Sequence, residues 1–195
     1  MEVYIDMTLA SYISCLRIVL IIPIICFLEL GETHTLFGSG PNFYIYLAFS
    51  LFVIAGLTDY LDGYIARKTD TETQLGALLD LIADKLLVSL IMVWLVYIEF
   101  TLSVAIPALI IVARELVIST LRQYVIEKRG KKDLSVSFIG KSKTTIQIIA
   151  ISMLILAQEI TSIYTLALIA IWFAAIFSLY SLFTYISEWF RHYLN

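Results

Sequence analysis

The sequence has very little of the cysteine and histidine from which many metal and redox sites are built. Among 195 residues there are two cysteines and two histidines. Cys15 and Cys26 match no metal-binding or redox spacing, and a buried free cysteine usually serves as a small apolar residue. His34 and His192 have no neighbours that resemble metal ligands. The sequence therefore gives no sign of a cysteine- or histidine-based site.

Charge is also scarce. Only 15% of the residues are Asp, Glu, Lys or Arg, whereas 61% are hydrophobic and the mean hydropathy is +0.92; soluble domains are about 45–50% apolar. Internal repeats and low-complexity segments are absent. No small-residue cleavage site follows the first apolar stretch, so we expect no removable signal peptide. The composition predicts one membrane domain, residues 1–195.

Apolar stretches predict how this domain crosses the membrane. A spanning helix needs about 20 apolar residues, and six stretches approach that length: 17–30, 42–66, 77–98, 101–126, 138–158 and 162–187. Residues 2–16 are only mildly apolar, and we expect them to lie along the membrane interface. The predicted fold is an all-α, polytopic membrane protein with six transmembrane helices and a short N-terminal interfacial segment.

Lysine and arginine are missing from three of the predicted loops, which sets the expected orientation. The loops without a cation are 31–41, 98–101 and 158–162. All thirteen Lys and Arg residues can be assigned to the opposite side. Because cytoplasmic loops carry the excess of Lys and Arg, both termini and the loops 67–76 and 127–137 are predicted to be cytoplasmic. Five or seven spans would place cations on both sides.

Four carboxylates stand out against this apolar background: Asp59, Asp62, Asp80 and Asp84. An ionisable group at membrane depth costs about 2.5–3.5 kcal/mol on insertion scales, so it suggests a function. The spacings i,i+3 and i,i+4 place each pair on one helical face. The short connection 68–75 makes the two helices antiparallel neighbours, which brings the pairs to similar depth. Because four such carboxylates would repel one another, two bridging divalent cations are the simplest way to stabilise them.

Small and basic residues accompany the acids. Gly63, Ala66 and Gly76 would let a ligand or another backbone approach closely, although ordinary helix packing would explain each of them alone. Arg67 lies on the same face as Gly63 and is suited to binding phosphate. This part of the sequence therefore combines metal-binding and phosphate-binding features.

A second basic group belongs to the fourth and fifth predicted spans. Arg114 is deep enough to require an anionic partner, and Arg122 follows it in the same span. Lys141 and Lys143 open the fifth span and point about 200° apart, so spacing cannot decide which of them faces a pocket. We interpret the cations of the intervening loop as topology signals and contacts to lipid headgroups: Lys128, Arg129, Lys131 and Lys132.

The acidic motif as a whole resembles a known signature. The pattern Asp59-x2-Asp62-Gly63-x2-Ala66-Arg67-x8-Gly76-x3-Asp80-x3-Asp84 matches all eight specified positions of the CDP-alcohol phosphotransferase family. Nearly the whole chain shares the likeness, in supporting segments at 16–23, 58–68, 83–88, 113–122 and 137–147. The chain departs in two places from the pattern of the subfamily that it resembles most. Leu81 follows the third aspartate, where that subfamily usually has proline. Residues from Leu9 to Ser14 contain no proline and replace the usual Asn-Pro-x-x-Leu-Thr motif.

This resemblance implies a homodimer of six-helix subunits that transfers a phosphatidyl group from CDP-diacylglycerol to sn-glycerol 3-phosphate and releases CMP. It implies that two Mg²⁺ or Mn²⁺ ions are held by Asp59, Asp62, Asp80 and Asp84. Asp84 would also be the catalytic base. The CDP moiety would be bound by Gly63, Ala66, Arg67 and Gly76. Candidates for the phosphate of the acceptor are Arg114, Arg122, Lys141 and Lys143, with Arg114 the best of them.

Other readings remain open at this stage. Sister transferases that make cardiolipin, phosphatidylserine or phosphatidylinositol phosphate share the signature, so only the acceptor site discriminates among them. A membrane prenyltransferase also uses paired aspartates, but it lacks the pattern of Gly63, Ala66, Arg67 and Gly76. An ion-coupled transporter would place acids among helices too, commonly with inverted repeats that this chain lacks. The expected location is the bacterial cytoplasmic membrane, with the active site on the cytoplasmic side, and no nucleic acid partner is implied.

Overall fold

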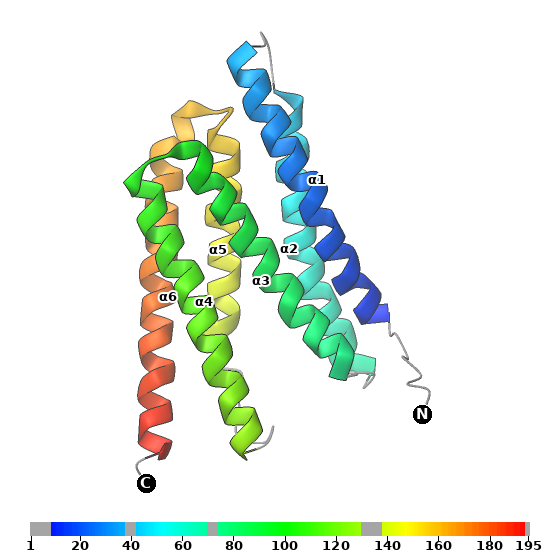
Figure 1. Ribbon diagram of the computed structural model, residues 1–195, viewed down its shortest axis with the longest axis vertical. Helices are drawn as coiled ribbons and strands as arrows, with labels where there is room; N and C mark the ends of the chain where they lie inside the picture. Colours follow the sequence, from blue (N-terminus) through cyan, green and yellow to red (C-terminus); the bar gives the residue numbers. More distant parts are fainter. Residues whose placement is uncertain (1–8, 38–41, 70–73, 130–137, 194–195) are drawn as a thin grey trace. The chain divides into compact units, whose positions relative to one another are not determined.

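The computed structural model describes residues 9–37, 42–69, 74–129 and 138–193, and its regular elements there are all helices (Figure 1). In chain order they are α1 (Leu9–Phe37), α2 (Phe43–Thr69), α3 (Gln74–Glu99), α4 (Leu102–Arg129), α5 (Phe138–Ala157), the short 3-10 helix η2 (Thr161–Ile163) and α6 (Tyr164–Tyr193). The predicted all-α class is therefore confirmed for the described part of the chain.

Four of these helices contain a segment that is long and apolar enough to cross a membrane. The segments are Ser11–His34, Leu78–Glu99, Leu102–Leu121 and Thr161–Ser187. The apolar parts found in α2 and α5 are shorter, Phe43–Thr58 and Lys143–Ala157, within the residues whose placement is described. The structure thus has the helices of a polytopic membrane protein, whereas six spans remain a prediction.

The first helix begins earlier than the sequence predicted. Residues 9–16 were expected in an interfacial segment, but they form the first turns of α1. Buried positions recur at helical spacing without interruption from Ser11, Ser14 and Arg17 to Ile21 and Ile24. A continuous buried stripe requires a continuous helix, because a change of direction would move the first positions off the packed face. The prediction was therefore wrong for residues 9–16, and residues 1–8 lie outside the described part.

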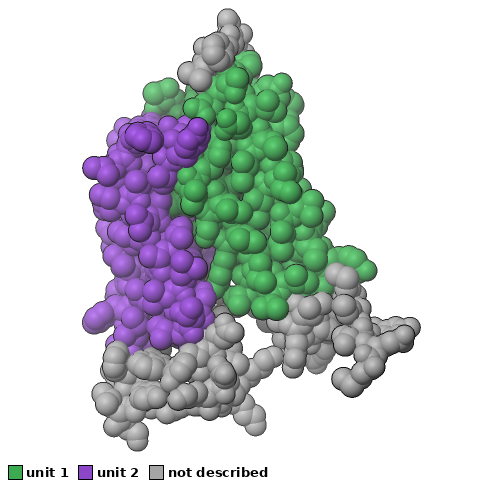
Figure 2. Space-filling view, in the orientation of Figure 1, with its two compact units in different colours: residues 1–94, 155–161 green, residues 95–154, 162–195 purple. Residues whose placement is uncertain are grey.

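The chain divides into two compact units, which Figure 2 colours separately. Unit 1 comprises residues 1–94 and 155–161. Within it α1 packs along α2, and the contact is close at Gly31, where an added Cβ would lie 2.9 Å from Cγ1 of the fully buried Ile45. Asn42, just before α2, donates a hydrogen bond from Nδ2 to the Gly31 carbonyl oxygen at 2.6 Å. Glycine at this position lets the two helices meet at short range.

The first part of α3 also belongs to unit 1 and contacts α1 at two levels. Arg17 pairs with Asp80, and further along both helices Trp94 Nε1 donates a hydrogen bond to Glu29 Oε2 at 3.3 Å. The two contacts follow the same order in both helices, so α1 and α3 run parallel. The described core of α3 in this unit is apolar, with buried residues Ala83, Leu87, Val88, Ile91, Met92 and Trp94.

Unit 2 comprises residues 95–154 and 162–195. The helices α4 and α6 contact each other, and each contains small buried residues, such as Ala108 in α4 and Ala174 in α6. The turn from α3 to α4 passes through Phe100, which has a φ of 47° and is 90% exposed. Beside this turn, the Tyr164 hydroxyl of α6 donates a hydrogen bond to Glu99 Oε2 at 2.9 Å.

Candidate functional site

The four signature aspartates lie on the two helices of unit 1 that the connection 70–73 joins. Asp59 and Asp62 are in α2, and Asp80 and Asp84 are in α3. Asp62 precedes the end of α2 by seven residues, and Asp80 follows the start of α3 by six. The backbone therefore places both pairs within about three turns of this connection, Asp59 and Asp84 somewhat farther from it than the one to two turns expected from the sequence.

Only some of the residues of this predicted site have side chains that the structure describes. The side chains of Asp59, Asp62, Ala66 and Arg67, and the surroundings of Gly63, lie outside the described residues. In α3, Gly76 is buried, Asp84 is half-buried, and the side chain of Asp80 is 46% exposed. Gly76, Asp80 and Asp84 occupy successive turns of α3 at intervals of four residues, so they share one broad face.

Arg17 of α1 is a member of this site that the sequence analysis missed. Its guanidinium Nη1 donates a hydrogen bond to Asp80 Oδ1 at 3.3 Å, and its side chain is completely buried. The sequence analysis counted Arg17 only among the cations that set the orientation. The signal that pointed to Arg114, a cation inside an apolar stretch, applies equally to Arg17, which lies between Leu16 and Ile18.

The chemistry of the α3 acids fits a hard divalent cation. Carboxylate oxygens are the ligands that Mg²⁺ and similar ions take, and Asp80 and Asp84 offer them one turn apart. No group of three or more His, Cys, Asp or Glu side chains that could hold a metal occurs among the described residues. Since the side chains of Asp59 and Asp62 lie outside that set, the described part contains half of the predicted ligands.

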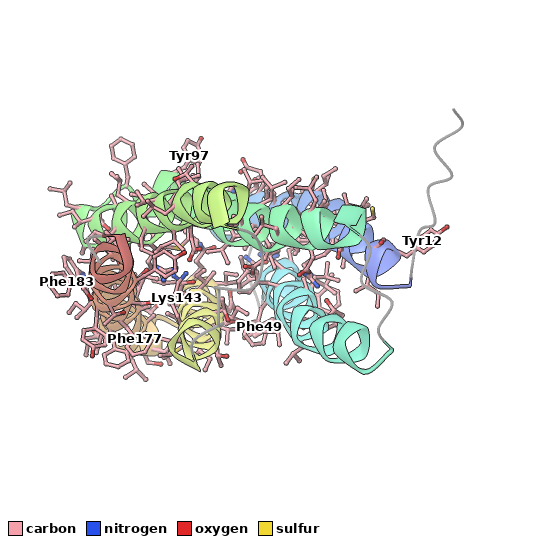
Figure 3. All side chains as sticks on the ribbon, turned by 90° about the horizontal axis from the view of Figure 1, so that it is seen from below. Tyr12, Phe49, Tyr97, Lys143, Phe177 and Phe183 are labelled. Carbon is pink, nitrogen blue, oxygen red and sulfur yellow. The ribbon has the colours of Figure 1, made fainter. Side chains whose placement is uncertain are left out.

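A second group of polar side chains lies inside unit 2, and we call Arg114, Glu115, Lys143 and Ser181 the Arg114 cluster. Arg114 is 7% exposed; its Nη2 donates a hydrogen bond to Ser181 Oγ at 2.7 Å, and its Nη1 lies 3.6 Å from Glu115 Oε1. Lys143 is 3% exposed and forms an ion pair with the same Glu115 oxygen. Figure 3 shows the Lys143 side chain among α4, α5 and α6, whereas Phe183 points outward.

This cluster retains unused hydrogen-bond donors. Nε of Arg114 is buried without a hydrogen-bond partner in the described part of the chain, and so is Nε2 of Gln147, one turn after Lys143 on α5. A buried donor left unsatisfied costs about 1–3 kcal/mol, so an acceptor at this place would be stabilising. Phosphate oxygens are suitable acceptors for a guanidinium beside an ammonium group.

The structure places two of the four basic residues that were proposed to bind the acceptor phosphate. It brings Arg114 and Lys143 together through Glu115, and it shows that Lys143 faces the interior. The side chains of Arg122 and Lys141 lie outside the described residues. Glu115 and Ser181 are further residues that the sequence analysis did not assign. Glu115 could have been found as an acid inside an apolar span, but a serine in α6 gives no comparable signal.

The comparisons with known proteins agree with the sequence signature. A family model described as CDP-alcohol phosphatidyltransferase matches residues 7–180. The relatives include bacterial proteins named CDP-diacylglycerol–glycerol-3-phosphate 3-phosphatidyltransferase. The one from Haemophilus influenzae is 39% identical over 136 residues, which cover 70% of this chain and 73% of its own. Those from Salmonella typhimurium and Escherichia coli K12 are 40% and 39% identical over 138 residues, which cover 70% of this chain and 75% of theirs.

These matches take in both units of the structure and confirm the predicted resemblance. The apolar helices and the bacterial relatives together indicate a protein of the inner membrane. The chain belongs to the CDP-alcohol phosphatidyltransferase family.

Proposed function

We propose that this protein transfers the phosphatidyl group of CDP-diacylglycerol to sn-glycerol 3-phosphate, which gives phosphatidylglycerol phosphate and CMP. Relatives named for this reaction are about 40% identical to it over 70% of the chain. The structural observation that carries the proposal is the buried Arg114 beside Lys143. These two cations share the single carboxylate of Glu115, so the cluster keeps an excess positive charge inside an apolar helical unit, which favours an anionic substrate group.

The nucleotide donor is assigned to unit 1. Proteins of this family generally depend on a divalent cation, and we assign two ions, Mg²⁺ or Mn²⁺, to Asp59, Asp62, Asp80 and Asp84. Such ions neutralise pyrophosphate charge and stabilise a departing phosphate oxygen. Gly76 is buried next to the acids, as a residue that lets a ligand approach closely would be. We assign the CDP moiety to Gly63, Ala66, Arg67 and Gly76.

The phosphate of the acceptor is assigned to the Arg114 cluster. Arg114 and Lys143 supply the positive charge, and Glu115 and Ser181 hold them in place through the contacts described above. Arg122 and Lys141 remain predicted contributors. A phosphorylated acceptor fits these residues better than serine, which offers no phosphate for two buried cations to bind.

Asp84 is proposed as the catalytic base. Its half-buried carboxylate would accept the proton of the free primary hydroxyl of glycerol 3-phosphate as that oxygen attacks the phosphorus that carries diacylglycerol. The new bond joins this oxygen to that phosphorus, and the bond from the same phosphorus to the oxygen of CMP breaks. The positive charge of Arg67 would help to hold the donor phosphates in place while this happens.

The arrangement in the membrane is also part of the proposal. Six spans, cytoplasmic termini and a cytoplasmic active site are supported by the distribution of Lys and Arg along the sequence. The six long helices provide an element for each predicted span. That residues 1–195 act as one domain is supported by the family match over residues 7–180. We propose a homodimer by the resemblance to the family.

The proposal is tested with purified protein in detergent. CMP release is measured with CDP-diacylglycerol, Mg²⁺ or Mn²⁺, and one acceptor at a time: glycerol 3-phosphate, inositol phosphate, serine or phosphatidylglycerol. We expect glycerol 3-phosphate to give by far the highest kcat/KM. Inositol phosphate as the best acceptor would keep the phosphate site but assign the protein to a sister activity. Phosphatidylglycerol as the best acceptor would likewise assign the protein to a sister activity, whereas serine as the best acceptor would refute the role given to the Arg114 cluster.

A further inference from the structure

The ion pair between Arg17 and Asp80 joins the interior of unit 1 to a predicted metal ligand. Arg17 is the largest side chain among those that are almost fully buried, and it continues a polar stripe on α1 that begins with Ser11 and Ser14. A buried charge must be paired to be tolerated, and one of its partners is the Oδ1 atom of Asp80 at 3.3 Å. The guanidinium is thus held beside this carboxylate by the packing of α1.

The two partners differ in their access to solvent. The Arg17 side chain is fully buried, whereas that of Asp80 is 46% exposed. A carboxylate has about four lone-pair sites, so one bond from Arg17 leaves capacity for a further cation on the exposed side. A metal ion at Asp80 would therefore bind close to a fixed positive charge, which opposes its binding.

We propose that Arg17 is a positioning residue that acts through Asp80 and has opposite effects on two ligands. In the absence of nucleotide, its charge competes with the divalent cation for Asp80 and weakens metal binding. Once a nucleoside diphosphate is bound at the metal, the same charge would attract its phosphates through the short distance across Asp80 and strengthen nucleotide binding, since opposite charges attract strongly where water is excluded. Metal binding and nucleotide binding are thereby coupled through one residue. This inference rests on the metal and CDP sites of the proposed function.

The test compares Arg17→Gln with the unchanged protein in two binding measurements. Mn²⁺ binding without nucleotide is followed by electron paramagnetic resonance, and CDP binding at saturating Mn²⁺ is followed by calorimetry. Because a neighbouring charge changes cation affinity at a carboxylate by about tenfold or more, we expect Mn²⁺ to bind about tenfold more tightly. We expect CDP to bind about tenfold more weakly. A role confined to stability would weaken both.

Two further variants keep the test decisive. Glu29→Gln removes the acid of the other contact between α1 and α3 and is the matched control, for which both affinities should stay unchanged. Arg17→Lys keeps the charge, so CDP affinity should stay within about threefold of the unchanged protein, since the phosphate attraction persists. If Arg17→Gln does not fold, a large loss of CDP affinity in a folded Arg17→Lys variant would overturn the inference.

The possible failures are distinguishable. Equal or weaker Mn²⁺ binding by Arg17→Gln would overturn the inference while leaving the acceptor assay, and with it the proposed function, intact. An unchanged protein that binds neither Mn²⁺ nor CDP would instead refute the donor site on which both depend.

Discussion

Lys143 of α5 forms an ion pair with Glu115 of α4 inside unit 2, and Arg114 approaches the same carboxylate oxygen. Helical spacing could only show that Lys141 and Lys143 point in different directions. The structure assigns the interior direction to Lys143, which is 3% exposed. Glu115 therefore brings together cations from two helices that a phosphorylated substrate would need on one side.

We expect Lys143→Gln to raise the KM for glycerol 3-phosphate more than Lys141→Gln does. A hydrogen bond to a charged group contributes about 1.5–3 kcal/mol, and every 1.4 kcal/mol corresponds to about a tenfold change in affinity. The loss should therefore be about tenfold or more, and it is measured as the KM in the CMP release assay. Cys26→Ala, an exposed position in α1, is the control and should leave KM unchanged.

A larger effect of Lys141→Gln would contradict the assignment of Lys143 to the substrate. Lys143→Gln also removes a partner of the Glu115 carboxylate, so the thermal stability of this variant should be lower than that of the unchanged protein. The variant Lys143→Gln with Glu115→Gln should recover part of this stability without recovering the KM. Recovery of both would mean that Lys143 serves only to neutralise Glu115.

We expect Ser181→Ala to raise the KM for glycerol 3-phosphate with a smaller effect on kcat. Ser181 Oγ accepts a hydrogen bond from Arg114 Nη2 at 2.7 Å and so fixes the guanidinium. A hydrogen bond to a charged group contributes about 1.5–3 kcal/mol, which corresponds to about a ten- to hundredfold change as an upper limit, because Ser181 acts on the substrate only through Arg114. The matched control is Ser187→Ala on the same helix, where the side chain is exposed and bonds only to the Thr184 carbonyl oxygen among its described contacts. Equal KM values for the two variants would contradict this role.

The sequence was sufficient to predict the helices because apolar runs and their charged ends depend on local composition. Each predicted span overlaps one long helix, from α1 to α6. The prediction of an interfacial segment was wrong for residues 9–16 because it depended on average hydropathy. Ser11 and Ser14 lower that average, yet they occupy the buried face of α1 and continue the stripe of Arg17, Ile21 and Ile24. Burial of polar residues depends on tertiary partners, which hydropathy does not contain.

The motif itself fixes which residues of the predicted site share a helical face, whereas contacts between residues that are distant in the sequence could not be predicted. Gly76, Asp80 and Asp84 share a face of α3 because their spacing is helical. Arg17 is 63 residues from Asp80, and Ser181 is 67 residues from Arg114. No local sequence pattern predicts contacts between residues so far apart in the chain. The general rule that a cation in an apolar span needs an anionic partner would nevertheless have identified Arg17 as a candidate.

We expect Asp84→Asn to lower kcat by a factor of about 10² to 10⁴, the usual contribution of a positioned general base. Asparagine has nearly the same shape but cannot accept the proton of the attacking hydroxyl. Single-turnover CMP release measures the chemical step, and electron paramagnetic resonance measures Mn²⁺ binding in the same preparation. Mn²⁺ affinity should fall much less than kcat, since three other carboxylates are assigned to the ions. A variant with near-normal kcat would refute the assignment of Asp84 as the base, and a proportionate loss of Mn²⁺ binding would make it a ligand only.

We expect Gly31→Ala to destabilise unit 1, although alanine is ordinarily the better helix former by about 1 kcal/mol. The added Cβ would lie 2.9 Å from Ile45 Cγ1 and nearer still to Ile45 Cδ1, and Ile45 is fully buried. Overpacking of this kind costs about 1–3 kcal/mol, which thermal unfolding in detergent measures. Ile45→Val removes the Cδ1 atom, so the double variant should be more stable than the two separate losses predict. Strict additivity would show that α1 moves away from α2 instead of colliding with Ile45. Gly31 lies fourteen residues from Arg17 along α1, so Mn²⁺ binding per folded molecule should be unaffected in all three variants.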